Sequence, residues 1–250
     1  MKIMHLIAAA AVLLALGAPV CAANTDSRIE SSAKQSYVFK TYLKGDDIKV
    51  MSKEGVVTLT GNVAVTSHKA LAQQTVEDLP GVKSVDNKLV VKNEPPANSD
   101  AWLHDKVKIT LLFHRSVRAG KTEVEVKDGV VTLTGQAKSQ AQKELTTEYA
   151  KDVEGVKDVV NNMTVLGSEK NMPRTMGEKI DDTSITTQVK MALLFHRSTS
   201  AVSTKVTTKS GVVMLSGKAR NTAEKDLVTK IVEDINGVKN VRNMMEVEQQ

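Results

Sequence analysis

The sequence predicts an α+β protein built from three tandem units, each with two helices packed on one face of a three-stranded sheet. The first observation behind this prediction is internal repetition, since a glycine-flanked strand motif of the form G-V-V-x-L-x-G occurs three times. The second is the order of hydrophobic patterns inside each copy, which is helix, strand, strand, helix, strand. The motif copies are residues 55–61, 129–135 and 211–217.

The first helix of each unit is predicted from apolar residues that recur every four positions, as in Leu103, Val107 and Leu111. An aspartate precedes each of these stripes and is an acceptable N-cap. The three aspartates are Asp26, Asp100 and Asp182. A short strand should follow each helix, at residues 49–52, 123–126 and 205–208.

A tight hairpin should join the first strand to the second, because Glu, Asp or Ser precedes glycine at the turn and suits a backbone with positive φ. These turns are residues 53–55, 127–129 and 209–211. The second strand of each unit is then the Val-Val-x-Leu-x run of the repeated motif.

The second helix follows the motif, with Ser139 and Asn221 as caps and Gln142 and Glu224 three residues later, as in a capping box. Each second helix is expected to stop at a glycine, where a left-handed C-cap is free of Cβ strain. Because this helix returns the chain from the second strand to the third, those two strands should be parallel. The glycines are Gly81, Gly155 and Gly237, and the last strands are predicted at residues 82–91, 156–165 and 238–247.

Residues 1–23 have the character of a secretory signal peptide, with an almost wholly apolar run at 3–20. We expect cleavage after Ala22 or Ala23, which leaves no transmembrane span in the mature chain. A lipoprotein would instead carry its acyl group on Cys21, but the preceding Ala-Pro-Val sequence suits lipidation poorly.

The repeat boundaries divide the mature chain into three domains joined by two linkers, and each domain is large enough to bury a core. The domains are residues 24–92, 99–166 and 182–250, and the linkers are residues 93–98 and 167–181. Lys and Arg outnumber Asp and Glu by 34 to 29. Counted over residues 28–92, 99–166 and 182–249, the outer units carry +3 each while the middle unit is neutral. This surplus favours anionic partners weakly.

Composition excludes several classes of function. A single cysteine rules out a disulfide framework or a thiolate zinc site. With only three Phe, three Tyr and one Trp there is little material for stacking on nucleic-acid bases, and export also argues against a nucleic-acid partner. No cofactor or metal site is predicted, because the histidines have no His or Glu partner at zinc-protease spacing. The histidines of the mature chain are His68, His104, His114 and His196.

The hexapeptide Leu-Leu-Phe-His-Arg-Ser occurs twice and places His114-Arg115 and His196-Arg197 at the C-terminal ends of two first helices. One interpretation is an anion clamp. The other is favourable positive charge at the end of a helix. Unit 1 has Lys40-Thr41 at the corresponding positions, which weakens the interpretation of a shared site.

Three further segments carry a resemblance to a known family. They read D-L-P-G-V-K-S-V, D-V-E-G-V-K-D-V and D-I-N-G-V-K-N-V, at residues 78–85, 152–159 and 234–241. Together with the αββαβ order and the glycine-flanked strand, they resemble the BON domain of OsmY-like bacterial envelope proteins. The resemblance implies three BON units, a periplasmic non-enzymatic protein linked to envelope or osmotic stress, and contact with phospholipid surfaces.

Two lysines should share one end of each unit, because the second and third strands are parallel and both begin there. We use the term lysine end for the hairpin turn between the first and second strands together with the start of the third strand. We expect the His-Arg pairs at the opposite end of each unit. The lysines are candidate contacts to an anionic surface, although exposed lysines on turns commonly serve solubility alone. They are Lys53 and Lys83, Lys127 and Lys157, and Lys209 and Lys239.

The repeated glycines are interpreted as backbone positions that need positive φ or close packing. They are Gly55, Gly61, Gly81, Gly129, Gly135, Gly155, Gly211, Gly217 and Gly237. Asn87, Asn161 and Asn243 recur in the last strand, where a local backbone hydrogen bond or a bulge explains them.

Three functional hypotheses follow. The first is a module that binds phospholipid or another anionic envelope surface. The second is a chaperone-like holdase for unfolded envelope proteins. The third, an enzyme, is disfavoured because no activated nucleophile or acid–base pair stands out. Binding to lipid should depend on salt, whereas suppression of client aggregation should persist in salt.

Overall fold

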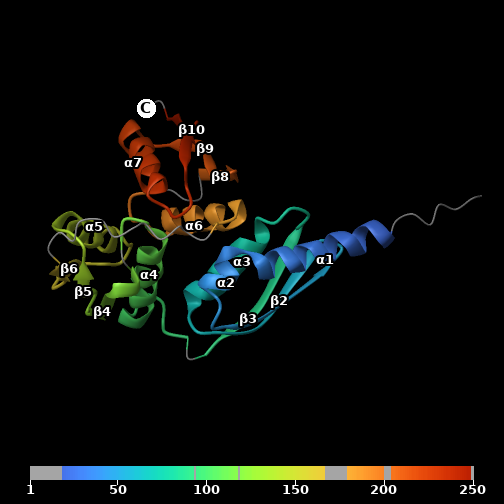
Figure 1. The fold of residues 1–250 in the computed structure, drawn as a ribbon, viewed down its shortest axis with the longest axis horizontal. Helices are drawn as coiled ribbons and strands as arrows, with labels where there is room; N and C mark the ends of the chain where they lie inside the picture. The colour runs from blue at the N-terminus through green and yellow to red at the C-terminus, as the bar shows by residue number, and fades with distance from the viewer. Residues whose placement is uncertain (1–18, 93, 118, 167–178, 200–203, 249–250) are drawn as a thin grey trace, which may run out of the picture.

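The computed structural model describes residues 19–92, 94–117, 119–166, 179–199 and 204–248. Residues 3–18 of the expected apolar signal run and residues 167–178 of the second linker lie outside these residues. In the described part, three units surround a central group of helices and their sheets lie toward the outside (Figure 1). No described helix is both long enough and apolar enough to cross a bilayer.

Each unit has the predicted order of elements. Unit 1 consists of α1 (Pro19–Gln35), α2 (Tyr37–Thr41), β1 (Asp47–Lys53), β2 (Val56–Val63), α3 (Thr66–Glu77) and β3 (Ser84–Val91). Unit 2 consists of α4 (Asp100–Phe113), the short 3-10 turn η1 (Ala119–Lys121), β4 (Thr122–Lys127), β5 (Val130–Ala137), α5 (Gln140–Lys151), β6 (Asp158–Asn161) and β7 (Thr164–Val165). Unit 3 consists of α6 (Asp182–Phe195), β8 (Thr204–Lys209), β9 (Val212–Ala219), α7 (Thr222–Glu233), β10 (Asn240–Asn243) and β11 (Glu246–Val247).

The strand bearing the repeated motif is central in every sheet. In unit 1, β2 pairs antiparallel with β1 and parallel with β3, and units 2 and 3 repeat this arrangement. The parallel pairing of the second and third strands is therefore confirmed. Lys53 lies opposite Val56, which in turn lies opposite Ser84, so the first and third strands meet the hairpin at one end of the sheet.

The third strand is interrupted in units 2 and 3 where an asparagine bonds to backbone. Asn161 donates its amide to Lys143 O at 2.9 Å and to Thr147 Oγ1 at 2.7 Å, and its Oδ1 accepts from Met163 N at 3.0 Å. Pairing resumes at Thr164. Asn243 makes the equivalent contacts in unit 3. The predicted local role of these asparagines is confirmed.

Two predictions about helix ends are wrong. The N-caps of α4 and α6 are Ser99 and Asp181, one residue earlier than predicted, and Asp26 lies inside α1. The second helices end before the expected glycines: α3 stops at Glu77, and Gly81 follows within the next turn. Aspartate is favourable both at the N-cap and in the first turn of a helix, so residue type alone does not show which of these two positions Asp100 and Asp182 occupy.

The nine repeated glycines all have positive φ, between +80° and +122°. The closest approach of the chain lies inside the second strand. A Cβ at Gly61 would stand 1.9 Å from Asp47 O on β1, and a Cβ at Gly135 would stand 2.1 Å from Lys121 O. Any side chain there would push the first strand away from the second.

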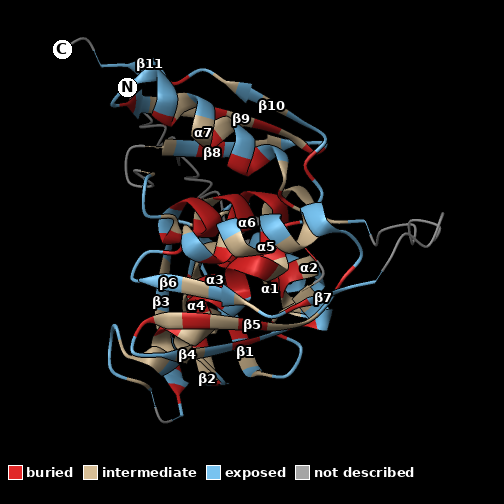
Figure 2. Ribbon diagram, turned by 90° about the vertical axis from the view of Figure 1, so that its left-hand side faces the viewer, coloured by how far each residue is buried: buried red, intermediate tan, exposed pale blue. Residues whose placement is uncertain are grey.

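Buried apolar residues form two clusters instead of one core per unit. The first joins the interiors of units 1 and 3 and includes Ile109 and Phe113 from α4. The second belongs to unit 2. Figure 2 shows buried residues concentrated on α6, which lies against helices of the other units. Units 1 and 3 therefore share one hydrophobic interior.

Candidate functional site

The lysine ends are built around the repeated aspartate and the hairpin. In unit 1, Asp26 accepts hydrogen bonds from Ser52 Oγ at 2.6 Å, Glu54 N at 2.7 Å and Gly55 N at 2.9 Å. The hydrogen bond from Ser52, followed by those from the hairpin backbone, lowers the pKa of Asp26. The turn itself has two consecutive residues with positive φ, Glu54 at 55° and Gly55 at 81°, as expected for a type I′ hairpin.

The same aspartate contact occurs in the other two units. Asp100 accepts from the backbone N–H groups of Asp128 and Gly129 at 2.7 and 2.8 Å. Asp182 accepts from Ser210 and Gly211 at 2.6 and 2.8 Å. The repeated aspartate therefore fixes the hairpin against the first helix.

The second lysine of each end crosses the hairpin glycine. In unit 2, stem carbons of Lys157 lie 3.1–3.2 Å from the place that a Cβ of Gly129 would take, and Lys157 Nζ donates to Asp128 O at 2.9 Å. In unit 3, Lys239 Nζ donates to Ser210 O at 3.2 Å. The glycine thus leaves room for the aliphatic stem, and the ammonium group lies on the exposed turn.

The structure brings the predicted lysine pairs to one end of each unit. Lys53, Lys127 and Lys209 end the first strand, while Lys83 and its counterparts stand just before the third. All six side chains are exposed. Two strand spacings separate the pair, which is about 10 Å. Each unit therefore presents two cations at one end of its sheet.

The two hexapeptides do not act as isolated helix ends, because they join units 2 and 3. His114 forms a backbone bridge with Ile235, and His196 forms the corresponding bridge with Val153. Arg115 N donates to Asp234 O, and Arg197 N donates to Asp152 O, both at 2.9 Å. We call this reciprocal contact of residues 113–116 with 233–236, and of 195–198 with 151–154, the clasp.

The arginine side chains of the clasp cap a helix of the neighbouring unit. Arg115 Nη1 donates to Val238 O at 3.1 Å, and Nη2 contacts Glu233 O. Arg197 Nη2 donates to Val156 O at 3.0 Å and also contacts Lys151 O. Both interpretations made from the sequence are thereby corrected: the carbonyls belong to the last residues of α7 and α5 and to the segments that follow these helices, and they accept hydrogen bonds from the guanidinium groups that an anion clamp would need.

This capping also changes where the arginines lie. Val238 directly precedes Lys239, and Val156 directly precedes Lys157. Arg115 therefore lies beside the lysine end of unit 3. Within unit 2, to which it belongs, it lies at the end opposite the lysine end. Sequence patterns do not reveal these contacts, because each joins residues of different units: Arg115 contacts Val238 and Arg197 contacts Val156. The signal available was the hexapeptide itself, which occurs in units 2 and 3 and is absent from unit 1.

Carboxylates hold the clasp from inside. Asp234 Oδ2 accepts from Tyr149 OH at 2.7 Å and lies 3.3 Å from His114 Nδ1, whose ring stacks on Tyr149 at 3.7 Å. Burial raises the pKa of Asp234, but contacts with His114, Ser116 and Tyr149 outweigh burial and leave this pKa below its usual value.

The mirrored carboxylate is Asp152. Its contact with His196, at 3.4 Å between Oδ2 and Nε2, is the largest influence and lowers the pKa of Asp152 despite partial burial. Both acids are therefore held in the ionised form beside a histidine. Among the residues that the structure describes, no group of three or more His, Cys, Asp or Glu side chains could hold a metal ion.

A groove opens at the lysine end of unit 3. It is lined by Arg115 of unit 2, by Lys179 and Lys239, and by the backbone of Gly211 and Gly237. Asp181 and Asp182 also line it, but Asp181 accepts from Tyr37 N at 2.8 Å and Asp182 accepts from the hairpin. Cations from two units therefore converge on one exposed groove.

The fold and these ends define a class of protein: a tandem array of small α+β domains with cationic ends. The chain belongs to the BON domain family, whose domain matches residues 25–93, 99–167 and 181–249. It therefore contains three BON domains, one in each unit.

The relatives are bacterial proteins. The chain is 33% identical over 144 residues to osmotically-inducible protein Y of Escherichia coli, a match that covers 58% of this chain and 70% of that protein. It is 31% identical over 144 residues to the outer membrane lipoprotein DolP of Haemophilus influenzae, covering 57% of this chain and 71% of that protein. Among solved structures, CdsD of the Chlamydia trachomatis type III secretion system is 17% identical with a TM-score of 0.24, and covers 88% of this chain and 90% of that one.

Proposed function

We propose that this protein is a non-enzymatic envelope protein of the periplasm that docks reversibly on anionic phospholipid through its lysine ends. Family membership and the names of the two relatives, one osmotically inducible and one an outer membrane lipoprotein, support an envelope protein linked to osmotic stress. The docking mechanism rests on the residues of this chain.

The observation that carries the proposal is the groove at the lysine end of unit 3. Arg115, Lys179 and Lys239 line this groove, and Lys209 ends the adjoining strand. Arg115 keeps its positive charge while its guanidinium caps α7. Four cations therefore lie close to a single hairpin, together with the carboxylates of Asp181 and Asp182. Each Lys or Arg near an anionic bilayer contributes about 1 kcal/mol. Four cations less two carboxylates leave a net charge of two, which corresponds to about 2 kcal/mol. Docking through unit 3 alone is therefore very weak, and the lysine end of unit 1 is needed to strengthen it.

The proposed docking is electrostatic, so it should be weak and sensitive to salt. The screening length is about 8 Å near physiological ionic strength, which is shorter than the distance across the sheet. Binding therefore requires the lysine ends to approach the headgroups closely. Neutral vesicles offer no such attraction.

Flotation of the protein with vesicles tests the proposal. We expect binding to phosphatidylglycerol vesicles at low salt, little binding to phosphatidylcholine vesicles, and release as salt rises. Equal binding to both kinds of vesicle, or binding that salt does not weaken, would contradict docking through lysines.

A holdase for envelope proteins remains the second candidate, because the outer faces of the sheets expose apolar side chains. Met51, Val90 and Met244 are 65%, 57% and 59% exposed, and methionine adapts to varied partners. This function predicts that the protein suppresses aggregation of an unfolded client at high salt as well as at low salt. Loss of suppression at high salt would instead favour the electrostatic mechanism.

A further inference from the structure

The outward faces of the sheets in units 2 and 3 carry opposite charge. Alternate residues of a strand point to opposite faces, so the buried positions identify the helix-covered side and the exposed positions identify the outer side. In unit 3 the buried residues Val206 and Val213 mark the inner side. The charged residues of the outer side are Lys205, Lys209, Lys218, Arg242 and Glu246. This face therefore has four cations and one anion.

The corresponding face of unit 2 is acidic. Its charged residues are Glu123, Glu125, Lys127 and Asp158. Several of these occupy the same place in the repeat as an oppositely charged or neutral residue of unit 3, as Glu123 does with Lys205. The outer face of unit 2 therefore has three anions and one cation on a backbone of the same shape.

These charges are not neutralised within the chain. All the charged residues of the two faces are exposed, and no ion pair in the described part of the structure includes any of them. Unit 1 differs, because Lys88 and Asp86 on its outer face pair with each other at 2.7 Å. The complementary pair of faces is thus confined to units 2 and 3.

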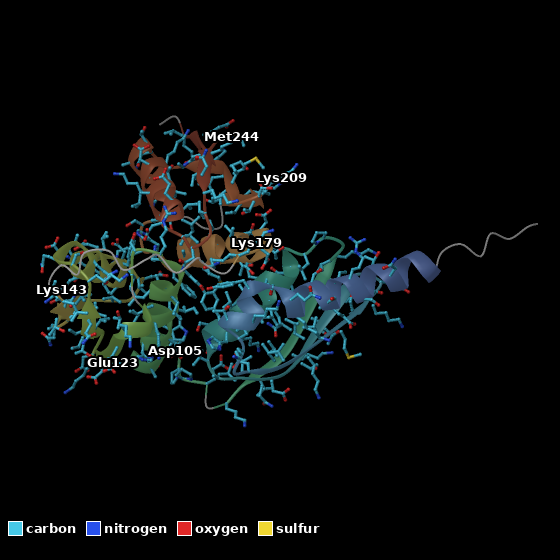
Figure 3. All side chains as sticks on the ribbon, viewed as in Figure 1. Asp105, Glu123, Lys143, Lys179, Lys209 and Met244 are labelled. Atoms are coloured by element: carbon cyan, nitrogen blue, oxygen red, sulfur yellow. The ribbon has the colours of Figure 1, made fainter. Side chains whose placement is uncertain are left out.

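The two faces cannot meet inside one molecule. Helices α4 and α6 contact each other and lie between the two sheets, which therefore face away from the centre. Figure 3 shows Glu123 at the lower edge of unit 2, while Lys209 and Met244 lie together on the outer side of unit 3. A partner for either face must come from another molecule.

We propose that the basic outer face of unit 3 binds the acidic outer face of unit 2 of a second copy of this chain. Such a contact is head-to-tail, so each molecule keeps one free face at either end and further copies can add. Lys209 and Lys127 belong both to these faces and to the lysine ends, but the other charged residues of the faces lie outside the lysine ends, so the inference can be tested separately from lipid binding.

The contact should be weak. A three-stranded sheet of this length offers a face of roughly 15 by 25 Å, which is about half of the 800 Å² that each partner of a stable complex buries. Much of the attraction comes from exposed charges, which salt screens. We therefore expect reversible chains at high protein concentration and low ionic strength.

Sedimentation velocity with charge-reversed variants tests the proposal. The first variant makes unit 3 acidic and carries Lys205→Glu, Lys218→Glu and Arg242→Glu. The second makes unit 2 basic and carries Glu123→Lys, Glu125→Lys and Asp158→Lys. A control variant carries Lys44→Glu, Lys49→Glu and Lys92→Glu, which alters net charge equally on exposed residues of unit 1.

We expect the parent and the control to associate at low salt, with the association constant falling at least about tenfold between about 20 and 300 mM salt. Each reversed variant should be monomeric alone, and an equimolar mixture of the two should associate again, because the reversed faces are complementary to each other. Circular dichroism checks that every variant is folded.

Three results would overturn the proposal. The parent could remain monomeric at low salt, the mixture could associate no more than its components, or the control could lose association as the first variant does. Loss of vesicle binding by the first variant, with a monomeric parent, would assign the basic face to lipid instead. None of these outcomes depends on whether the lysine ends bind lipid.

Discussion

At the scale of single residues, the lysine ends depend on contacts that fix the backbone. The repeated aspartate accepts two hairpin N–H groups, and the hairpin glycine leaves room for the lysine stem, as Asp100, Gly129 and Lys157 show. The exposed cations are therefore presented by a turn that is held at both sides. This explains why an aspartate, a glycine and a lysine recur together in all three units.

The glycine inside the second strand should be intolerant of any side chain. Replacing Gly135 by Ala puts a Cβ 2.1 Å from Lys121 O at a φ of +109°, and we expect a loss of about 2 kcal/mol or more in the free energy of unfolding. Gly120→Ala is the matched control, because nothing lies within 4 Å of its Cβ. Urea denaturation measures the stability of both variants. Equal denaturation midpoints would show that the strands move apart at no cost and would contradict the prediction.

The clasp carboxylate Asp234 gives a pH-dependent prediction. Its folded pKa lies below the unfolded value of about 3.9, so its contribution to stability is present above that value and is lost as pH falls through the folded pKa. Asp234→Asn should therefore lower the melting temperature near neutral pH, and the difference from the parent should shrink below about pH 4. A difference that stays constant down to pH 2 would mean that the ionised carboxylate is not what stabilises the clasp.

Sequence patterns predicted some of these residue roles and not others. The positive φ of the hairpin residues, Glu54 and Gly55 in unit 1, follows from local turn chemistry. The hydrogen bond that each asparagine Oδ1 accepts from the backbone two residues later is equally local, whereas the contacts of the asparagine amide with the second helix are not. Ser210 N and Gly211 N donate to Asp182 across the whole of the first helix and the first strand, so no local pattern reveals these hydrogen bonds. An aspartate at the start of a helix is explained well enough as a cap, which hides its second partner.

At the scale of elements, the ends of α4 and α6 determine how units 2 and 3 are joined. Each helix continues into a hexapeptide whose backbone pairs with the turn after α7 or α5. The two halves are equivalent, because Asn236 N donates to Phe113 O at 2.9 Å and Glu154 N donates to Phe195 O at 2.8 Å. The repeat within the sequence thus produces a nearly twofold contact inside one chain.

Removing one arginine of the clasp should loosen both halves. Arg197→Ala deletes charge-assisted bonds to carbonyls of α5 and its following turn, and we expect a loss of about 1–2 kcal/mol. Arg197→Lys should restore little, because a single ammonium cannot span several carbonyls as a guanidinium does. Arg242→Ala, on the exposed outer face of unit 3, is the control.

Hydrogen exchange gives the direct measurement of this loosening. The amide protons of Glu154 and Asn236 are donated across the clasp, so both should exchange faster in Arg197→Ala than in the control. Unchanged protection at Glu154 would contradict a role for Arg197 in the clasp.

The pattern of the hexapeptide indicates only a basic helix end, because the dipole at the C-terminus of its own helix and the C-terminus of a neighbouring helix both attract arginine.

At the scale of the whole molecule, the units are coupled and not merely linked. Val38 N donates to Ser184 Oγ at 3.1 Å, Tyr42 OH donates to Gln188 Oε1 at 3.1 Å, and Lys190 pairs with Asp78 at 2.5 Å. Periodicity predicts that α6 has a buried face, but it does not say that part of this burial comes from another unit. The sequence therefore predicts the three folds more fully than it predicts their packing.

This packing makes the His-Arg pairs unsuitable as a control for lipid binding. His196 and Arg197 follow the opposite end of their own sheet, but the clasp brings Arg197 beside Val156 and Lys157 of unit 2. Replacing them would disturb a lysine end as well as the joint between units. Exposed lysines outside the lysine ends are the better comparison.

The central claim is that the lysine ends of the basic outer units bind anionic phospholipid, and a flotation experiment with two quadruple variants tests it most directly. The test variant carries Lys53→Gln, Lys83→Gln, Lys209→Gln and Lys239→Gln. The matched variant carries Lys44→Gln, Lys92→Gln, Lys108→Gln and Lys138→Gln, all at exposed positions outside the lysine ends. Both lose the same net charge, so only the position of the lysines differs.

Both variants and the parent are floated with phosphatidylglycerol vesicles at low salt, after circular dichroism has shown that they are folded. At about 1 kcal/mol for each lysine, the test variant should bind at least about a hundredfold more weakly than the parent. The matched variant should retain most of the parent's binding. Equal binding by the test variant and the parent, or equal losses in the two variants, would contradict the claim that the lysine ends form the lipid-binding surface.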